Sequence, residues 1–283
     1  MYANLPLKEK IPHIIPIIPV YLIIMEVTFT MNYYIIFNSS SNNFLRMISL
    51  FLFEPFSILT IITHLKSMLT SPGYVPIPFN QIISNEKEKK GENFCKQCNN
   101  NRPPRAHHCK ICKKCTLKMD HHCPWVANCV GYYNQKNFYQ FLFYSTISDL
   151  LAFIFLFVQF MNTDTTIKNN IPNNIKITSP FILIYYMWGP IQIVISLLCS
   201  LAMTISIGTL FYKQTYMLLN NQTTIDKKKF ENWESSPYFE KNQFKSFCGV
   251  MGSNIFQWFS LKFYGDDPYY LERNKGYFSL ENI

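Results

Sequence analysis

Four long apolar stretches constrain the fold of this chain more than any other feature of its sequence. Each is long enough for the roughly 20 residues with which a helix crosses a bilayer. They cover residues 14–37, 47–68, 138–161 and 181–212. Buried core helices are the alternative, but four stretches of this length within 283 residues argue against them. The sequence therefore predicts an α-helical polytopic membrane protein with four transmembrane helices.

Basic residues are unevenly divided among the segments that these helices would separate. Residues 1–13, 66–137 and 213–283 hold 23 of the 26 Lys and Arg in a chain whose net charge is +9. The positive-inside rule places these three segments in the cytosol. The first stretch lacks the small-residue cleavage site of a signal peptide, so we expect it to be a retained anchor. We expect cytosolic segments over 1–13, 69–137 and 213–283, and lumenal or extracellular loops over 38–46 and 162–180.

The predicted cytosolic domain, residues 69–137, concentrates the residues that bind metals. Seven of the nine cysteines and four of the six histidines lie within residues 95–129. Because stable disulfides are rare in the cytosol, metal binding is the better interpretation. Such a polar segment buries too little apolar surface to fold alone, so a metal such as zinc would supply folding free energy. Two cysteine pairs have the spacing of zinc knuckles, and spacing alone allows all four residues to form one site: Cys95, Cys98, Cys109 and Cys112. No internal repeat is evident in the sequence.

The number of potential ligands exceeds what two closed zinc sites require. Two four-coordinate sites need about eight ligands, whereas this segment offers seven cysteines and four histidines. Cys123 is the best candidate for a residue outside both sites, because Asp120 and His121 precede it closely. A neighbouring imidazole lowers the pKa of a thiol and makes it a nucleophile. This count alone is also consistent with Cys123 being a further metal ligand.

The segment Cys95–Gly131 resembles the cysteine-rich domain of the DHHC protein S-acyltransferases, or palmitoyltransferases. The matching elements are Cys-x2-Cys, Arg-Ala-His-His-Cys-x2-Cys-x2-Cys, Met-Asp-His-His-Cys-Pro-Trp and Asn-Cys-Val-Gly. The family's layout, with this small zinc-bound domain between the second and third transmembrane helices, extends the resemblance over most of the chain.

The resemblance implies a role for each residue of this motif. It implies two structural zinc ions, the first bound by Cys95, Cys98, His108 and Cys115 and the second by Cys109, Cys112, His122 and Cys129. Cys123 is then the nucleophile that accepts the acyl group, His121 the general base, and Asp120 the carboxylate that orients His121.

The reaction implied is the transfer of a long-chain fatty acyl group, palmitoyl, from acyl-CoA to Cys123 and then to cysteines of substrate proteins. The expected partners are the membrane, palmitoyl-CoA and proteins with membrane-proximal cysteines, with no nucleic acid. Arg105, Lys113 and Lys118 are candidates for the CoA phosphates, although a solvated, membrane-facing basic surface explains them equally. We expect residence in the Golgi, the endoplasmic reticulum or the plasma membrane.

The C-terminal tail and the apolar stretches contain further candidates for functional residues. Thr223-Thr224-Ile225-Asp226 resembles the family's Thr-Thr-x-Glu motif, with Asp226 in place of Glu, which implies that Thr224 lies near Asp120. Asn242 is the nearest match to a C-terminal family segment. Glu26, Glu54 and Asp149 lie inside apolar stretches, where ionisable groups are costly and often functional.

Two other functions are compatible with a membrane-bound zinc module. One is a catalytically inactive zinc-scaffolded membrane adaptor, which the intact catalytic motif argues against. The other is a membrane-anchored ubiquitin ligase of the RING type, whose ligand pairs are spread over longer intervals than those in this chain.

Overall fold

The computed structural model describes residues 15–33, 43–75, 94–161 and 180–263. The expected segments 1–13, 38–46 and 162–180 lie wholly or mostly outside these residues. The chain divides into two compact units. The first contains residues 1–17, 62–141 and 212–283, and the second contains residues 18–61 and 142–211.

The described part of the chain contains three helices that are long and apolar enough to cross a membrane. They span Arg46–Leu69, Gln135–Met161 and Trp188–Leu219. The first comprises α3 (Asn43–Ile48), a π-helical segment (Ser49–Phe53) and α4 (Glu54–Leu69), and the others correspond to α5 (Gln135–Met161) and α7 (Pro180–Leu219). These helices overlap the expected spans 47–68, 138–161 and 181–212. A shorter apolar helix, α2 (Ile17–Met31), lies within the first expected span, 14–37, whose two ends are outside the described residues.

Prolines account for local features of these helices. The π-helical segment ends directly before α4, whose second residue is Pro55. Proline lacks the N–H that would continue the ladder of hydrogen bonds, and a π-bulge is one way in which a helix accommodates such an interruption. Pro190 lies inside α7, as membrane helices tolerate.

The second unit is held together by an apolar core and by polar contacts between its helices. Its buried core consists of Val27, Met31, Phe53, Ala152, Phe155 and Leu156. Ser196 donates to both carboxylate oxygens of Glu26 at 2.8 Å, and Asn32 donates to Glu54 at 2.9 Å. Interhelical hydrogen bonds of this kind stabilise helix packing in a bilayer. Glu26 and Glu54 therefore have structural partners.

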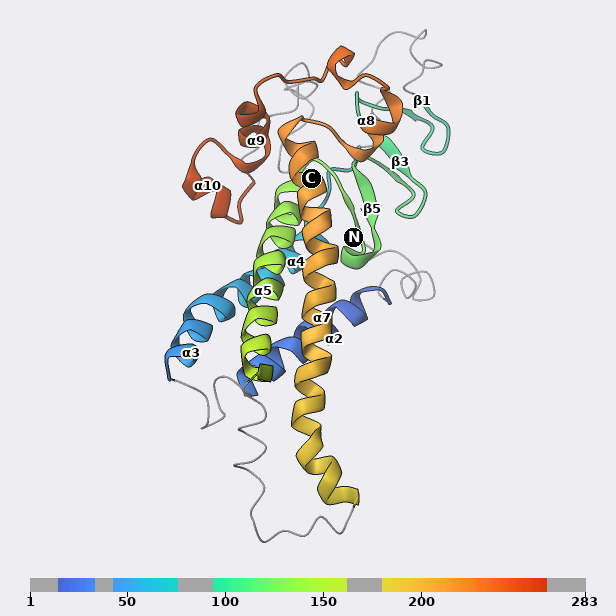
Figure 1. Ribbon diagram of the computed structural model, residues 1–283. Coiled ribbons are helices and arrows are strands. Elements are labelled where there is room, and N and C mark those ends of the chain that lie inside the picture. The colour runs from blue at the N-terminus through green and yellow to red at the C-terminus, as the bar shows by residue number, and fades with distance from the viewer. Residues whose placement is uncertain (1–14, 34–42, 76–93, 162–179, 264–283) are drawn as a thin grey trace. The chain divides into compact units, whose positions relative to one another are not determined.

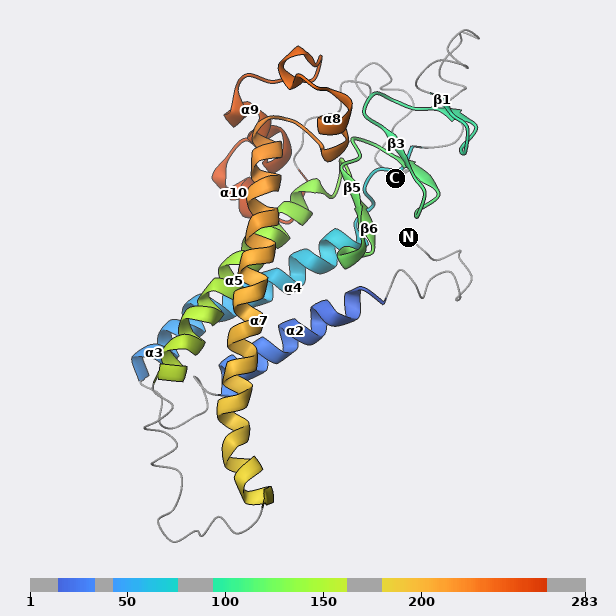
Figure 2. The same ribbon diagram turned by 45° about the vertical axis from the view of Figure 1, so that its right-hand side comes forward.

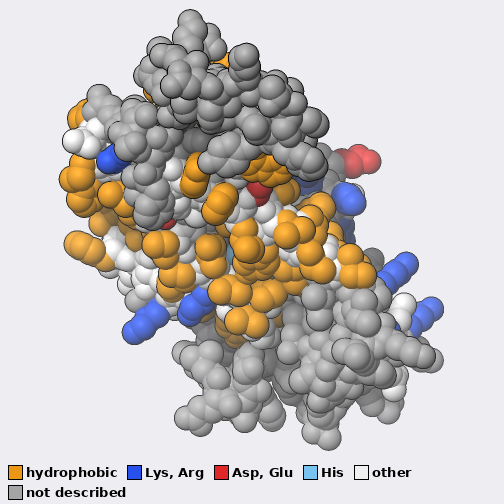
Figure 3. Space-filling model, turned by 90° about the horizontal axis from the view of Figure 1, so that it is seen from below, with side chains coloured by type: hydrophobic (Ala, Val, Ile, Leu, Met, Phe, Trp, Pro, Cys, Tyr) orange, Lys and Arg blue, Asp and Glu red, His pale blue; other side chains and the backbone are white. Residues whose placement is uncertain are grey.

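The outward surface of these helices is apolar. Large exposed hydrophobic side chains lie on α2, α4, α5 and α7, among them Leu22, Phe29, Ile58, Phe157 and Leu198. Figure 3 shows hydrophobic side chains gathered on one face of the molecule, with lysines and arginines at the margins. An apolar exterior with backbone groups satisfied inside helices is what a bilayer requires.

The described residues of the first unit include three short antiparallel hairpins. They are formed by β1 (Phe94–Cys95) with β2 (Asn100–Asn101), β3 (His107–Cys109) with β4 (Lys114–Thr116), and β5 (His121–Cys123) with β6 (Asn128–Val130). Helix α8 (Thr224–Lys229) lies near the hairpins in both ribbon views (Figures 1 and 2). After the 3₁₀ turn Trp233–Ser235 come α9 (Gln243–Met251) and α10 (Ile255–Phe259). The tail is tied to the start of α5, because Lys136 donates to the carbonyls of Gln257 and Lys262 and Gln140 donates to those of Trp258 and Ser260.

The three hairpins repeat at an interval of 14 residues. Their last residues on the first strand are Cys95, Cys109 and Cys123. The turn residues Asn99, Lys113 and Ala127 recur at the same interval and all have positive φ angles, of 48°, 55° and 46°. The expectation that the chain has no internal repeat is therefore wrong at this scale. Beyond the cysteines, the histidine pairs His107-His108 and His121-His122 recur at this interval, whereas most other side chains differ.

Candidate active site and metal centres

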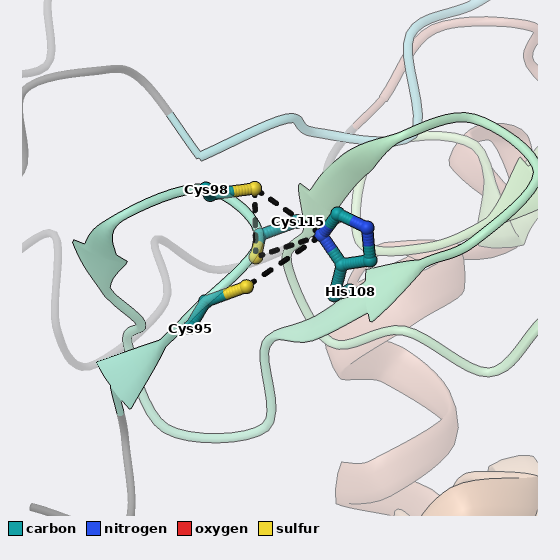
Figure 4. A group of neighbouring side chains, drawn as sticks. All are labelled: Cys95, Cys98, His108 and Cys115. Atoms are coloured by element: carbon teal, nitrogen blue, oxygen red, sulfur yellow. Dashed lines mark hydrogen bonds between the residues drawn. The ribbon is translucent and has the colours of Figure 1, made fainter.

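Two groups of cysteine and histidine side chains are assembled by the hairpins. The first contains Cys95, Cys98, His108 and Cys115, and the second contains Cys109, Cys112, His122 and Cys129. Within each group, all four potential ligand atoms lie within 4.8 Å of one another. Figure 4 shows the first group, in which the Nδ1 atom of His108 lies 3.6, 3.2 and 3.9 Å from the three sulfurs of Cys95, Cys98 and Cys115.

Each group joins two successive hairpins. A cross-strand pair supplies one histidine and one cysteine: His108 opposite Cys115 in the first group and His122 opposite Cys129 in the second. Of the two remaining cysteines, one ends the first strand of the preceding hairpin and the other lies in its turn. The spacing of the cysteines alone allowed a single site formed by Cys95, Cys98, Cys109 and Cys112. The structure instead brings together the two sets that the resemblance implied.

The composition of these groups suits a zinc ion. Three thiols and one imidazole form the donor set of closed structural zinc sites. Hydrogen bonds from the Cys112 and Cys129 thiols hold the pKa of Cys109 far below the ordinary thiol value, whereas bonding to Cys109 and Cys112 raises the pKa of Cys129 far above it. Three thiols this close together cannot all ionise without a cation beside them. The residues present therefore fit a divalent metal at each group.

A second kind of arrangement is formed on β5 by His121 and Cys123 and directly before it by Asp120. The Asp120 Oδ2 atom lies 2.7 Å from His121 Nδ1, and Cys123, two residues further along the strand, interacts electrostatically with the same imidazole. Asp120 also accepts from the Gln214 side chain at 2.9 Å and from the backbone N–H of Thr224. Three donors therefore hold a buried carboxylate, and that carboxylate orients the imidazole next to the thiol.

The electrostatics of this arrangement favour an ionised aspartate and a basic histidine. Burial disfavours charge on Asp120, but its hydrogen bonds to His121, Thr224 and Gln214 outweigh this effect and lower its pKa to about 2. Burial would likewise lower the pKa of His121, but Asp120 and Cys123 together raise it to about 9. An imidazole of this basicity can hold the proton of a thiol at neutral pH.

Cys123 is part of neither metal group. It is buried at the end of β5, where it pairs with Asn128 across the hairpin. In the 14-residue repeat, the position of Cys98 and Cys112 is occupied by Val126 in the third hairpin. Cys123 therefore has no second cysteine with which to form a knuckle, and the thiol is available for other chemistry.

The structure also places the other candidate residues that were predicted from the sequence. Arg105 forms an ion pair with Asp226 at 2.6 Å, and its guanidinium lies 5.1 Å from the centre of the Tyr238 ring. Asp226 also caps the start of α8 by accepting from the Thr223 N–H at 3.0 Å. Desolvation lowers the pKa of Lys118 to about 7, and Lys113 is exposed. Thr224 lies at Asp120, as the resemblance implied, but contacts it through its backbone.

Some contacts of this site could not be found from the sequence. Gln214 and Phe138 had no role assigned to them, although Gln214 binds Asp120 and the ring of Phe138 lies 5.5 Å from that of His121. Both residues lie on the long apolar helices, and no local motif marks them.

Comparisons with known proteins agree with this geometry. The family model described as DHHC palmitoyltransferase matches residues 88–231, about half of the chain. Palmitoyltransferase ZDHHC7 of Mus musculus is 32% identical over 75% of this chain and 68% of its own length. Probable protein S-acyltransferases 15 and 12 of Arabidopsis thaliana are each 30% identical over 68% and 79% of this chain, and over 74% and 76% of their own lengths. The chain belongs to the DHHC palmitoyltransferase family. This DHHC protein is an S-acyltransferase and an integral membrane protein, and the predicted family is confirmed.

The ion pair between Arg105 and Asp226 in this DHHC protein provides a test of how the tail supports the site. The two side chains are only 10% and 4% exposed. Replacing Asp226 with alanine leaves the buried Arg105 without its carboxylate, and breaking such a pair costs about 3–5 kcal/mol. We expect a clearly lower melting temperature and slower acylation, because α8 also carries the Thr224 N–H that binds Asp120.

Thermal unfolding and the rate of acylation from labelled palmitoyl-CoA would measure these effects. Glu240→Gln is the matched control, because it removes the more exposed ion pair with Lys245 and should change neither quantity. Equal behaviour of the two variants would contradict a supporting role for Asp226.

Proposed function

We propose that this chain transfers a long-chain fatty acyl group, palmitoyl, from acyl-CoA to cysteine thiols of substrate proteins through an acyl-Cys123 intermediate. One observation carries the proposal. Eight cysteines and histidines are gathered into two groups that could hold metal ions, while Cys123 stands outside both, two residues from a histidine that Asp120 orients and whose pKa Cys123 helps to raise. This geometry supports nucleophilic catalysis by Cys123, and an inactive adaptor has no use for it.

In the first step, His121 takes the proton of the Cys123 thiol, and the sulfur attacks the carbonyl carbon of the acyl-CoA thioester. The bond between that carbon and the CoA sulfur breaks, and His121 returns the proton to the departing thiolate. Asp120 stabilises the imidazolium formed between these events. In the second step, a substrate cysteine gives its proton to His121 and displaces Cys123 from the thioester. Because each step exchanges one thioester for another, neither requires ATP.

The proposal includes two structural zinc ions. One would be held by Cys95, Cys98, His108 and Cys115, and the other by Cys109, Cys112, His122 and Cys129. A bound zinc ion would neutralise the thiolates and hold successive hairpins together. Each group offers four ligands, so neither needs to provide a position for substrate.

The proposed membrane arrangement has four spans, with α2 in the first. Residues 1–13, 69–137 and 213–283 would face the cytosol, where acyl-CoA is available, and residues 38–46 and 162–180 the opposite side. The charge distribution supports this orientation. Arg105, Lys113 and Lys118 are the candidates for CoA phosphates, although the ion pair with Asp226 occupies much of the hydrogen-bonding capacity of Arg105. We propose the Golgi, the endoplasmic reticulum or the plasma membrane as its location.

Mapping the acyl group tests the proposed intermediate. Purified full-length protein would be incubated with deuterated palmitoyl-CoA, digested and analysed by mass spectrometry, with and without neutral hydroxylamine. We expect one palmitoyl group on the peptide that contains Cys123, released by hydroxylamine because it is a thioester, and transferred to an added cysteine peptide. A folded, zinc-loaded protein with no acyl group, or with one only on Cys199 or Cys248, would overturn the proposal in favour of the adaptor.

A further inference from the structure

His64 lies near the end of α4 and has no role in the acyl-transfer chemistry described above. Its side chain is fully buried, with 0% of the residue exposed. A buried imidazole in an apolar helix is costly unless it is hydrogen-bonded, so its partner is informative.

That partner is the backbone immediately after the nucleophile. The His64 Nε2 atom lies 3.0 Å from the carbonyl oxygen of Trp125. Because a carbonyl oxygen only accepts, Nε2 must carry the hydrogen and donate it. Trp125 is the middle residue of the 3₁₀ turn Pro124–Val126, which begins at the residue after Cys123. Trp125 as a residue is 52% exposed, whereas its carbonyl oxygen is held by the fully buried His64.

Another contact of His64 leads towards the general base. Its ring meets that of Phe141 edge to face at 5.0 Å, Phe141 lies 6.4 Å from Phe138, and Phe138 meets His121 edge to face at 5.5 Å. A continuous row of packed rings therefore connects His64 to His121. His64 is thus in contact with the turn that follows the thiol and, through two phenylalanines, with the base.

The hairpin that carries Cys123 is bound to α4 at a second point. Asn128, which pairs with Cys123 across the hairpin, donates its side-chain amide to the carbonyls of Ser67, Met68 and Thr70. These carbonyls belong to the end of a helix, where no intrahelical donor remains for them. Asn128 and His64 therefore hold the two sides of the Cys123 turn against successive turns of one helix.

We propose that His64 is a positioning residue for acyl transfer, whose Nε2–H bond to the Trp125 carbonyl fixes the backbone that follows Cys123 and so holds the thiol against His121. This inference rests on the proposed role of Cys123 as the nucleophile. Small displacements of a reacting group slow a reaction strongly, and a shift of about 1 Å can lower the rate about 10²-fold.

Three substitutions at position 64 separate hydrogen bonding from packing. His64→Gln places an N–H donor close to the position of Nε2. His64→Asn has the same amide on a shorter side chain, which cannot reach the Trp125 carbonyl. His64→Leu retains apolar volume against Phe141 and has no donor. Ser57→Ala is the control on the same helix, because it removes a contact with Thr28 at 3.3 Å that has no link to Cys123.

The rate of Cys123 acylation would be measured for each full-length variant as a function of palmitoyl-CoA concentration, together with zinc content. We expect His64→Asn and His64→Leu to lower the maximal rate about 30- to 100-fold with a nearly unchanged half-saturating concentration. His64→Gln should recover most of the wild-type rate, and Ser57→Ala should match it. Zinc content should stay the same in all four.

Equal rates for His64→Gln and His64→Asn would overturn the proposal, whether both are fast or both are slow. This comparison decides the matter even if His64→Leu does not fold, because both amide variants place a polar group in the same pocket. Failure of the underlying chemistry is distinguishable, because wild-type protein would then carry no acyl group on Cys123.

Discussion

Replacing Cys123 with serine is expected to abolish acyl transfer. A serine hydroxyl is a far weaker acid than a thiol, and His121, whose pKa is about 9, cannot remove its proton to a useful extent. The rate of self-acylation from labelled palmitoyl-CoA should fall by at least about 10⁴-fold, as it does when other covalent enzymes lose their nucleophile. Any residual label would be an oxygen ester, which neutral hydroxylamine leaves in place. The substitution is nearly isosteric, so zinc content and the melting temperature should stay close to the wild-type values.

The control uses the two cysteines that lie outside the zinc domain. Cys199→Ser and Cys248→Ser make the same chemical change at partly buried positions and should retain wild-type acylation. A Cys123→Ser variant that transfers palmitate at a normal rate, or a Cys248→Ser variant that does not, would contradict the assignment of the nucleophile.

Removal of the proposed zinc ions is the second prediction with a very large effect. The three hairpins have strands of two or three residues and little apolar core of their own. Binding of structural zinc contributes about 10–16 kcal/mol to folding in comparable small domains. We expect Cys129→Ser, at a fully buried position of the second group, to reduce the zinc content from two ions per chain to one or none and to abolish acylation. Elemental analysis and the exposure of thiols to an alkylating reagent would follow both changes.

Cys248→Ser again serves as the matched control, because it removes a thiol that belongs to neither group. A Cys129→Ser protein that still contains two zinc ions and remains active would show that the second group is not a metal site. Treatment of the wild type with a strong chelator should reproduce the phenotype of the variant, with all of the cysteines of residues 95–129 becoming reactive together.

Much of the site could be predicted from the sequence because its chemistry is local. The two groups and the Asp120–His121–Cys123 arrangement lie within 35 residues, and the knuckle spacing is set by the geometry of a tight turn. Their division into two interleaved groups was not derivable from spacing, because it depends on which hairpins face each other. The resemblance to a family supplied that division.

Contacts between residues that lie far apart in the sequence could not be predicted. Gln214 and Thr224 reach Asp120 across 94 and 104 positions, and Arg105 reaches Asp226 across 121. The substitution of Asp226 for Glu left its contacts open until the structure showed that the shorter carboxylate both pairs with Arg105 and caps α8. Three long apolar helices could be predicted because length and hydrophobicity define them, whereas α2 is shorter than the stretch that contains it.

The regular spacing of the hairpins explains how a reactive thiol can arise in a structural domain. Cys95 and Cys109 occupy a position whose surroundings suit an ionised sulfur, as the bond from the Cys112 N–H to the Cys109 sulfur illustrates. The third hairpin repeats that backbone, including the left-handed turn residue Ala127, but has Val126 where a second ligand would stand. In the proposed mechanism, the same small unit serves as scaffold where its first strand and turn carry two cysteines and as reaction centre where they carry one, so the side chain at a single turn position separates mechanical support from catalysis.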